Sequence, residues 1–166
     1  MPQIQIEVMR EEDWETVVAI YLEGIATGQA TFETSAPSFA HWNQAHLSFA
    51  RLVARRDGTI VGWGALSPVS TRSAYAGVAE VSVYVAAASR GTGVGRKLLA
   101  ALIEASEQNG IWTLQASVFP ENAASIALHR ACGFREVGRR QHIAQMNGVW
   151  RDTVLLERRS REIGID

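Results

Sequence analysis

Three glycines alternate with other residues in the stretch RGTGVGR, which runs from position 90 to 96. A β-branched run, VSVYV at 81–85, precedes them, and a leucine-rich pattern typical of a helix follows. Glycine lets backbone N–H groups come close to a ligand, and the amino end of a helix attracts anions. The spacing therefore predicts a binding site for a phosphate-bearing molecule between this strand and this helix.

Two common nucleotide motifs do not fit these glycines. A dinucleotide fold uses G-x-G-x-x-G and an acidic residue at the end of the next strand. Here the spacing is G-x-G-x-G, and the next strand ends in Val118-Phe119-Pro120. A Walker loop needs Gly-Lys-Ser/Thr after four spacers, which is absent. Two interpretations remain: a loop whose successive N–H groups hold a pyrophosphate, or a flexible connection between strand and helix.

Hydrophobic periodicity predicts the elements that position this loop. Helices are predicted within 11–27, 38–49, 93–110 and 121–134, and single strands at 4–8, 78–86 and 112–119. Two hairpins are predicted, at 50–69 about Asp57-Gly58 and at 135–159 about Asn147-Gly148. Asn122 is a candidate N-cap for the last helix, and Gly133 a candidate end signal. The order predicts one mixed α/β domain over residues 1–166.

Composition excludes several function classes. The 166 residues are 47% hydrophobic and 20% charged, with a net charge of −1, so we expect a soluble protein without nucleic-acid or membrane partners. No apolar run approaches the ~20 residues of a membrane span, and the first residues do not resemble a signal peptide. One cysteine, Cys132, fits a reducing compartment, so we expect a cytoplasmic protein. No histidine pair has metal-ligand spacing with a third ligand, so no metal is expected.

The glycine loop also carries a family resemblance. Arg90, Gly93 and Gly95 match the pattern Arg/Gln-x-x-Gly-x-Gly/Ala, and with it the chain resembles the GCN5-related N-acetyltransferases (GNAT). The resemblance implies a mostly antiparallel central sheet with a splayed pair of central strands, flanked by about four helices. It implies acetyl-CoA as the cosubstrate, with its pyrophosphate on the loop and its pantetheine arm along VSVYV. The implied cofactor contacts are Val83, Tyr84, Val85, Arg90, Gly91, Thr92, Gly93, Val94, Gly95, Arg96, Asn122 and Ser125.

A narrower resemblance rests on four blocks. TGQATFET (27–34), RSAYAGVAEVSVYV (72–85), FPENAASIALHRACGF (119–134) and NGVWRDTVLLERR (147–159) together resemble phosphinothricin acetyltransferases. Relatives in that group act on methionine sulfone, methionine sulfoximine and arsinothricin. The resemblance implies detoxifying N-acetylation of a small amino-acid analogue by a homodimer. Ala144 and Met146 replace the glycine and lysine usual in the last hairpin, and Val78 replaces a threonine, so the identity of the acceptor stays open.

The chemistry of acetyl transfer then defines catalytic candidates. A backbone N–H on the splayed strand, that of Val85, is expected to stabilise the oxyanion. Glu80 shares a strand face with Ser82 and Tyr84 and is the candidate general base; the alternative is a structural ion pair with an arginine. His129 lies at the helix position where the resemblance implies a general acid that protonates the leaving thiolate, or a general base paired with Glu80. The alternative is a structural histidine that packs against the end of its helix.

On the acceptor side, arginine suits carboxylate and phosphinate groups because it binds them in a bidentate manner. The resemblance implies a substrate arginine at Arg72, with Ser73 and Tyr75 beside it. Phe32 and Glu33 are expected to close the pocket, or else to form a turn whose phenylalanine packs inward. His41 and His46 are expected on a surface helix. The alternative functions are acetylation of a polyamine or a peptide N-terminus, and a non-catalytic acetyl-CoA-binding module.

Overall fold

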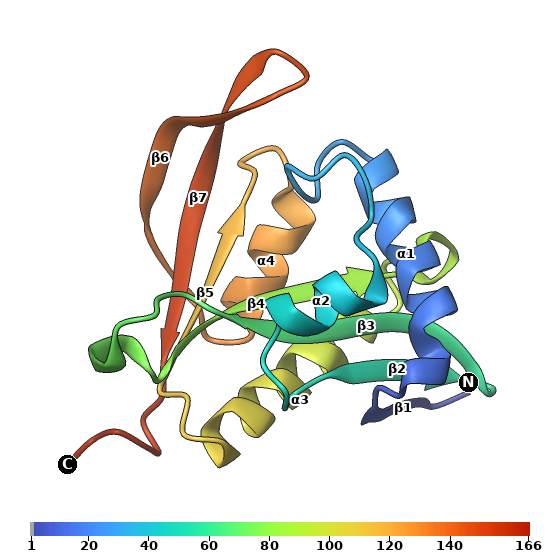
Figure 1. The fold of residues 1–166 in the computed structure, drawn as a ribbon, viewed down its shortest axis with the longest axis horizontal. Coiled ribbons are helices and arrows are strands. Elements are labelled where there is room, and N and C mark those ends of the chain that lie inside the picture. The colour runs from blue at the N-terminus through green and yellow to red at the C-terminus, as the bar shows by residue number, and fades with distance from the viewer. Residues whose placement is uncertain (1) are drawn as a thin grey trace.

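Seven strands form one sheet in the order β1-β2-β3-β4-β5-β7-β6 (Figure 1). The computed structural model describes residues 2–166. The strands are β1 (Ile4–Val8), β2 (Leu52–Arg56), β3 (Thr59–Pro68), β4 (Val78–Val85), β5 (Thr113–Val118), β6 (Arg135–Met146) and β7 (Val149–Arg159). The helices are α1 (Trp14–Ala26), α2 (Phe39–Ala45), α3 (Val94–Gln108) and α4 (Ala123–Ala131). This element order and the mixed α/β fold class confirm the sequence prediction.

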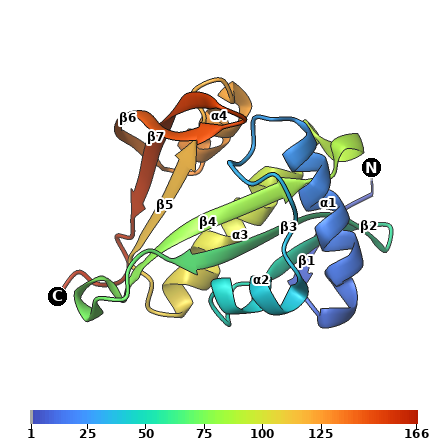
Figure 2. The same cartoon turned by 45° about the horizontal axis from the view of Figure 1, so that its top comes forward.

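The centre of the sheet splits between β4 and β5. These two strands form the single parallel pair among the described strands, and they pair only from Val78 and Thr113 to Glu80 and Gln115. On its other side β4 pairs with β3 as far as Val85. Figure 2 shows β4 and β5 diverging from their shared start. The splayed pair expected from the resemblance is therefore present, and it opens directly after Glu80.

Two hydrophobic clusters hold the helices on opposite faces of the sheet. Alternation along β3 directs Trp63 and Ala65 toward α1 and α2, and Leu66 toward α3. Gly62 and Gly64 face α3 as well, and an added Cβ at either would lie within 3 Å of a leucine of α3. Because glycine has no side chain, α3 can lie close against β3, the strand that pairs with β4. This packing fixes the position of α3, whose amino end is the glycine loop.

The predicted turns and caps are present, whereas several helices are shorter than predicted. Asp57-Gly58 and Asn147-Gly148 both have positive φ values, as a two-residue hairpin turn requires. The Asn122 side chain accepts a hydrogen bond from the Ser125 N–H and caps α4. The predicted helix 38–49 ends at Ala45, because the backbone is already extended at the next residue.

Candidate active site

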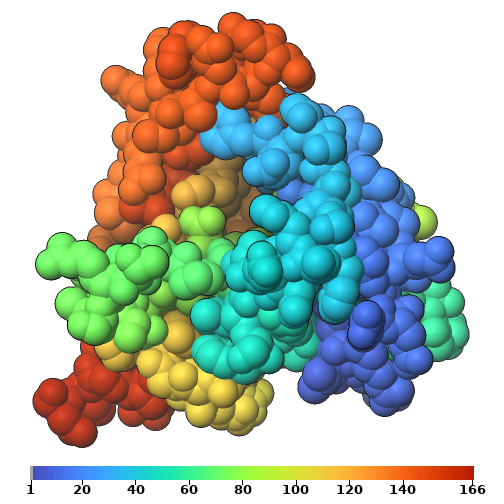
Figure 3. Space-filling view, in the orientation of Figure 1, coloured from blue at the N-terminus to red at the C-terminus, as the bar shows by residue number. Residues whose placement is uncertain are grey.

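A cleft of about 300 Å³ opens where β4 and β5 separate. Its walls come from the segment after α1, from β4, from the end of β5 and from α4. Figure 3 shows the hollow in the middle of this face, below the β6–β7 hairpin and beside the blue segment that follows α1. Eight of the residues expected from the sequence line this cleft: Phe32, Glu33, Glu80, Val83, Tyr84, Asn122, Ser125 and His129.

Glu80 lies at the last paired position of β4, at the apex of the split. Its Oε1 accepts a hydrogen bond of 3.1 Å from Gln115 Nε2, and the residue is half-buried. Within residues 2–166 it forms no ion pair with an arginine or lysine, so the structural alternative raised by the sequence is not what the structure shows. One carboxylate oxygen thus remains free for a ligand or a proton.

His129 faces the same cleft from α4 and is 5% exposed. Its Nδ1 lies 2.6 Å from the Ser125 carbonyl oxygen, which only accepts, so Nδ1 carries the hydrogen. The neutral ring therefore keeps a lone pair on Nε2. Burial lowers the pKa of His129. An imidazole with a lowered pKa is neutral near pH 7, so its Nε2 is able to accept a proton.

Beyond Glu80, the edge of β4 that faces β5 is unpaired and carries backbone hydrogen-bonding groups. The Ala86 N–H donates to the Val61 carbonyl at 2.8 Å, so the polar groups of this position face β3. Because these groups alternate along an antiparallel strand, those of Val83 and Val85 face the gap instead. An N–H in this gap can meet an oxyanion or an amide of an extended ligand.

The glycine loop forms the amino end of α3. Gly93 is the N-cap residue with a φ of +91°, and Gly91 has a φ of +74°. An added Cβ at either would meet nothing within 4 Å, so the loop is open to a ligand. The Thr92 hydroxyl donates to the Ser89 carbonyl at 2.6 Å and accepts from Arg56 Nη2 at 3.0 Å, which holds the loop in shape.

The first turn of a helix has N–H groups without intrahelical partners, so those of residues 94–96 can donate to an anion, whereas the Lys97 N–H donates to the Gly93 carbonyl at 3.2 Å. A Cβ at Gly95 would lie 3.6 Å from Val85 Cγ2. The anion site and the carboxyl end of β4 are therefore in contact, as a ligand spanning both requires.

Arg72, Ser73 and Tyr75 do not line the cleft of this chain. They are exposed in the loop before β4, and the Arg72 guanidinium lies 5.6 Å from the centre of the Tyr75 ring. The loop precedes the paired start of β4, whereas the cleft opens beyond Glu80. Among the described residues that line the cleft, two are acidic, Glu33 and Glu80, and none is lysine or arginine.

A second cavity of about 370 Å³ adjoins the cleft and shares four lining residues with it: Thr31, Glu33, Ser82 and Tyr84. Its walls include His41, Trp42 and His46, so the expectation of a plain surface helix was wrong for His46. That ring is half-buried and stacks on Trp42 at 4.2 Å, and Nδ1 donates to the Trp42 carbonyl at 2.8 Å. Burial lowers its pKa. The spacing of four residues between Trp42 and His46 was the available signal.

Within residues 2–166 the potential metal ligands are dispersed, and the one cysteine is partly buried against the core. No three histidine, cysteine, aspartate or glutamate side chains gather there in a metal-binding group. Cys132 follows α4 and packs against the larger core cluster, and burial raises the pKa of its thiol. None of the helices within 2–166 is long and apolar enough to cross a membrane.

Proteins of known sequence and structure are similar to this chain over most of its length. A relative from Alcaligenes faecalis, described as a phosphinothricin N-acetyltransferase, is 38% identical over 162 residues, which cover 92% of this chain and 81% of the relative. A crystal structure described as a ribosomal-protein-alanine N-acetyltransferase from Brucella melitensis has a TM-score of 0.87 and 33% identity, covering 94% of this chain and 99% of the other.

A second crystal structure is described as a GNAT superfamily phosphinothricin acetyltransferase from Sinorhizobium meliloti in complex with AcCoA. It has a TM-score of 0.85 and 28% identity, covering 94% of this chain and 88% of the other. The model of the acetyltransferase (GNAT) family matches residues 9–134. The split strands, the glycine loop and these matches lead to one conclusion: the chain belongs to the GNAT family and is an acetyltransferase.

Proposed function

We propose that this enzyme transfers the acetyl group of acetyl-CoA to the amino group of a small amino-acid analogue. The candidate acceptors are phosphinothricin, methionine sulfone, methionine sulfoximine and arsinothricin, and the role is detoxifying. The acceptor class is supported by the relative described as a phosphinothricin N-acetyltransferase. Acetyl-CoA is supported by the similar structure described in complex with it. The reducing compartment expected from Cys132 is consistent with a cytoplasmic enzyme.

One observation carries the catalytic part of the proposal: Glu80 and His129 line the same cleft at the split of β4 and β5. Glu80 has a free carboxylate oxygen that accepts a proton from the acceptor's ammonium group. The resulting amine attacks the thioester carbon, and neutral His129 takes the second proton as the C–N bond forms. The Val85 N–H donates to the oxyanion. When the C–S bond breaks, the imidazolium returns its proton to the thiolate.

The glycine loop fits the other end of acetyl-CoA. The open cradle at Gly91 and Gly93 and the free N–H groups of α3 suit a pyrophosphate, and the free edge of β4 suits the amides of the pantetheine arm. Asn122 and Ser125, at the start of α4, also line the cleft. These groups would hold the pyrophosphate and the pantetheine arm and so direct the thioester into the cleft that Glu80 lines.

The charges of the cleft bear on which charged groups the acceptor carries. Glu33 and Glu80 attract its ammonium group, but its acidic group needs a cation that the lining of one chain lacks. Arg72, after movement of its loop, or a second copy of the chain would supply this cation. The β6–β7 hairpin exposes Val149 (62%) and Trp150 (54%), which a homodimer would cover. Sedimentation at micromolar concentration tests this arrangement: a monomer of about 18 kDa would exclude shared pocket residues.

Two other acceptor classes have support of their own. A cleft with two carboxylates and no lysine or arginine among its described lining residues favours a polycationic amine. The similar structure described as a ribosomal-protein-alanine N-acetyltransferase favours a peptide N-terminus. Both alternatives use the same transfer chemistry and differ in the acceptor alone.

An acetyl-transfer screen separates these classes. The purified protein is incubated with acetyl-CoA and each amine, and the released thiol is measured. The proposal predicts turnover with the amino-acid analogues above and little with spermidine or an alanine-terminated peptide. Rapid turnover of the latter two, with none of the amino-acid analogues, would refute the proposed acceptor class.

A further inference from the structure

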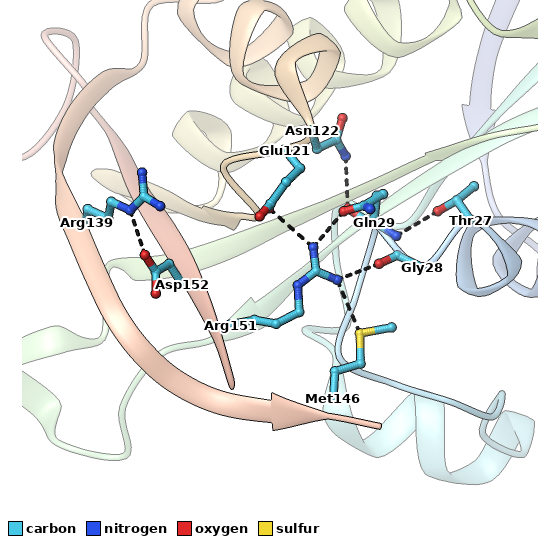
Figure 4. A network of polar contacts seen from close by, with 9 residues as sticks. All are labelled: Thr27, Gly28, Gln29, Glu121, Asn122, Arg139, Met146, Arg151 and Asp152. Atoms are coloured by element: carbon cyan, nitrogen blue, oxygen red, sulfur yellow. Dashed lines mark hydrogen bonds and ion pairs between the residues drawn. The ribbon is translucent and has the colours of Figure 1, made fainter. Parts of the chain in front are cut away.

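The β6–β7 hairpin extends past the sheet and lies opposite the segment that follows α1. β7 pairs with β5 only as far as Val154 and Val118, and the residues of β7 before Val154 pair with β6 alone. Arg151 lies in this extension, and its side chain reaches across to the segment after α1 (Figure 4). The side chain is 14% exposed. A largely buried guanidinium requires partners, and here they come from three different parts of the chain.

The guanidinium joins these parts by hydrogen bonds. Nη1 donates to the Gly28 carbonyl at 2.6 Å, and Nη2 donates to Gln29 Oε1 at 2.6 Å. Nη2 also lies 3.3 Å from Glu121 Oε2, just before α4. Nη1 lies 3.5 Å from Met146 Sδ across the hairpin. Asn122, which caps α4, donates from Nδ2 to the Gln29 carbonyl at 3.2 Å. The segment after α1 is thus tied to both the hairpin and α4.

The same guanidinium is linked to the cleft through two aromatic rings. Its Cζ lies 3.7 Å from the centre of the Phe119 ring. Phe119 in turn packs edge-on against Phe32, with 4.8 Å between ring centres. Both rings line the cleft, and Phe32 is followed by Glu33, one of its two carboxylates. Arg151 itself does not line the cleft, so a change at this residue would reach the cleft wall through these two rings.

We propose that Arg151 is a positioning residue that holds segment 27–33 over the cleft and so sets the affinity for the acceptor amine. The inference rests on the proposed function, because segment 27–33 carries the acceptor-side residues Phe32 and Glu33. Arginine suits this role because one planar fork donates to two different acceptors while its face stacks on a ring. Lysine has a point charge on a flexible stem and reproduces only part of this.

The kinetic test compares Arg151→Met with Arg151→Lys. Methionine keeps the apolar stem and removes every donor. Arg151→Met is expected to raise the Michaelis constant of the acceptor about tenfold or more while that of acetyl-CoA changes less than about twofold, since only the acceptor side is loosened. The Michaelis constant of Arg151→Lys for the acceptor is expected to lie between that of the unaltered protein and that of Arg151→Met. Arg139→Met is the matched control, because Arg139 lies on the same hairpin, is exposed and pairs with Asp152; its acceptor constant should stay unchanged.

Hydrogen exchange of the amides in 27–33 gives a readout that needs no acceptor. Arg151→Met should reduce about tenfold the protection of the amides in this segment that donate hydrogen bonds, namely Thr27, Gly28, Gln29 and Glu33. The β4 amides should keep their protection, and Arg139→Met should leave both sets unchanged. Unchanged protection in Arg151→Met, or lost protection with an unchanged acceptor constant, would overturn the positioning role. If the unaltered protein acetylates none of the amino-acid analogues, the proposed function fails, and the exchange of 27–33 still decides whether Arg151 holds the segment.

Discussion

Replacing Gly93 by alanine isolates the contribution of the glycine loop to acetyl-CoA binding. Gly93 has a φ of +91°, and an added Cβ meets nothing within 4 Å, so the cost to the free protein is backbone strain alone. That strain is about 1 kcal/mol, which corresponds to a fall of roughly 2–4 °C in Tm for a chain of this size. A larger β-branched residue would add strain of its own, and alanine is therefore the better choice.

Gly58 offers a matched control in the β2–β3 turn, with a φ of +77° and no atom within 4 Å of an added Cβ. Gly58→Ala should lower Tm by a similar amount and leave binding unchanged. In Gly93→Ala the methyl group keeps the pyrophosphate from the free N–H groups, and losing one hydrogen bond to a charged group costs about 1.5–3 kcal/mol. We expect acetyl-CoA affinity to fall about tenfold to a hundredfold, measured by calorimetry. Equal affinities in the two variants would refute the pyrophosphate site.

Two further predictions concern stability. Burial lowers the pKa of His46 and of His129 below 6.5, so the unfolded chain binds more protons as the pH falls through that value. The free energy of unfolding should then decrease by up to about 1.4 kcal/mol per pH unit for each histidine until the folded form is protonated as well; equal urea midpoints at pH 7.5 and 5.5 would contradict this. Gly77→Ala places a Cβ 2.1 Å from the Trp112 ring and should lower the free energy of unfolding by about 1–3 kcal/mol through overpacking. In the control Gly138→Ala the added Cβ meets nothing within 4 Å, so this loss should not occur. Thermal unfolding measures both, and equal Tm values would show that the ring moves aside freely.

Local patterns were sufficient to predict the elements and two residues of the cleft wall, Glu80 and His129. The order of strands and helices follows from periodicity, and the cap at Asn122 and the turn at Asn147-Gly148 follow from side-chain and backbone preferences. Glu80 and His129 were predicted from motif positions, and the structure brings both to one cleft. These features depend on short stretches of chain, which is why one sequence is enough.

Features that depend on distant contacts were not predicted. The hydrogen bond from Arg151 to Gly28 joins residues 123 positions apart, and no periodicity marks it. The burial of His46 depends on where Trp42 and α2 pack against the sheet, which the local spacing of Trp42 and His46 does not reveal. Arg72 was expected at the acceptor from its motif position; in one chain it lies in an exposed loop outside the cleft, and its contact with the acceptor stays a prediction.

The claim that acetyl transfer occurs at the split of β4 and β5 is tested most directly by Glu80→Gln. The glutamine oxygen still accepts the hydrogen bond from Gln115 Nε2, so the geometry is kept and only the basicity is lost. The measurement is acceptor-dependent release of the CoA thiol with methionine sulfone or phosphinothricin, alongside the acetyl-CoA dissociation constant. We predict that kcat falls about a hundredfold or more, as expected for a lost general base, with acetyl-CoA affinity unchanged. An unchanged kcat with the same affinity would contradict the account and return Glu80 to a structural role.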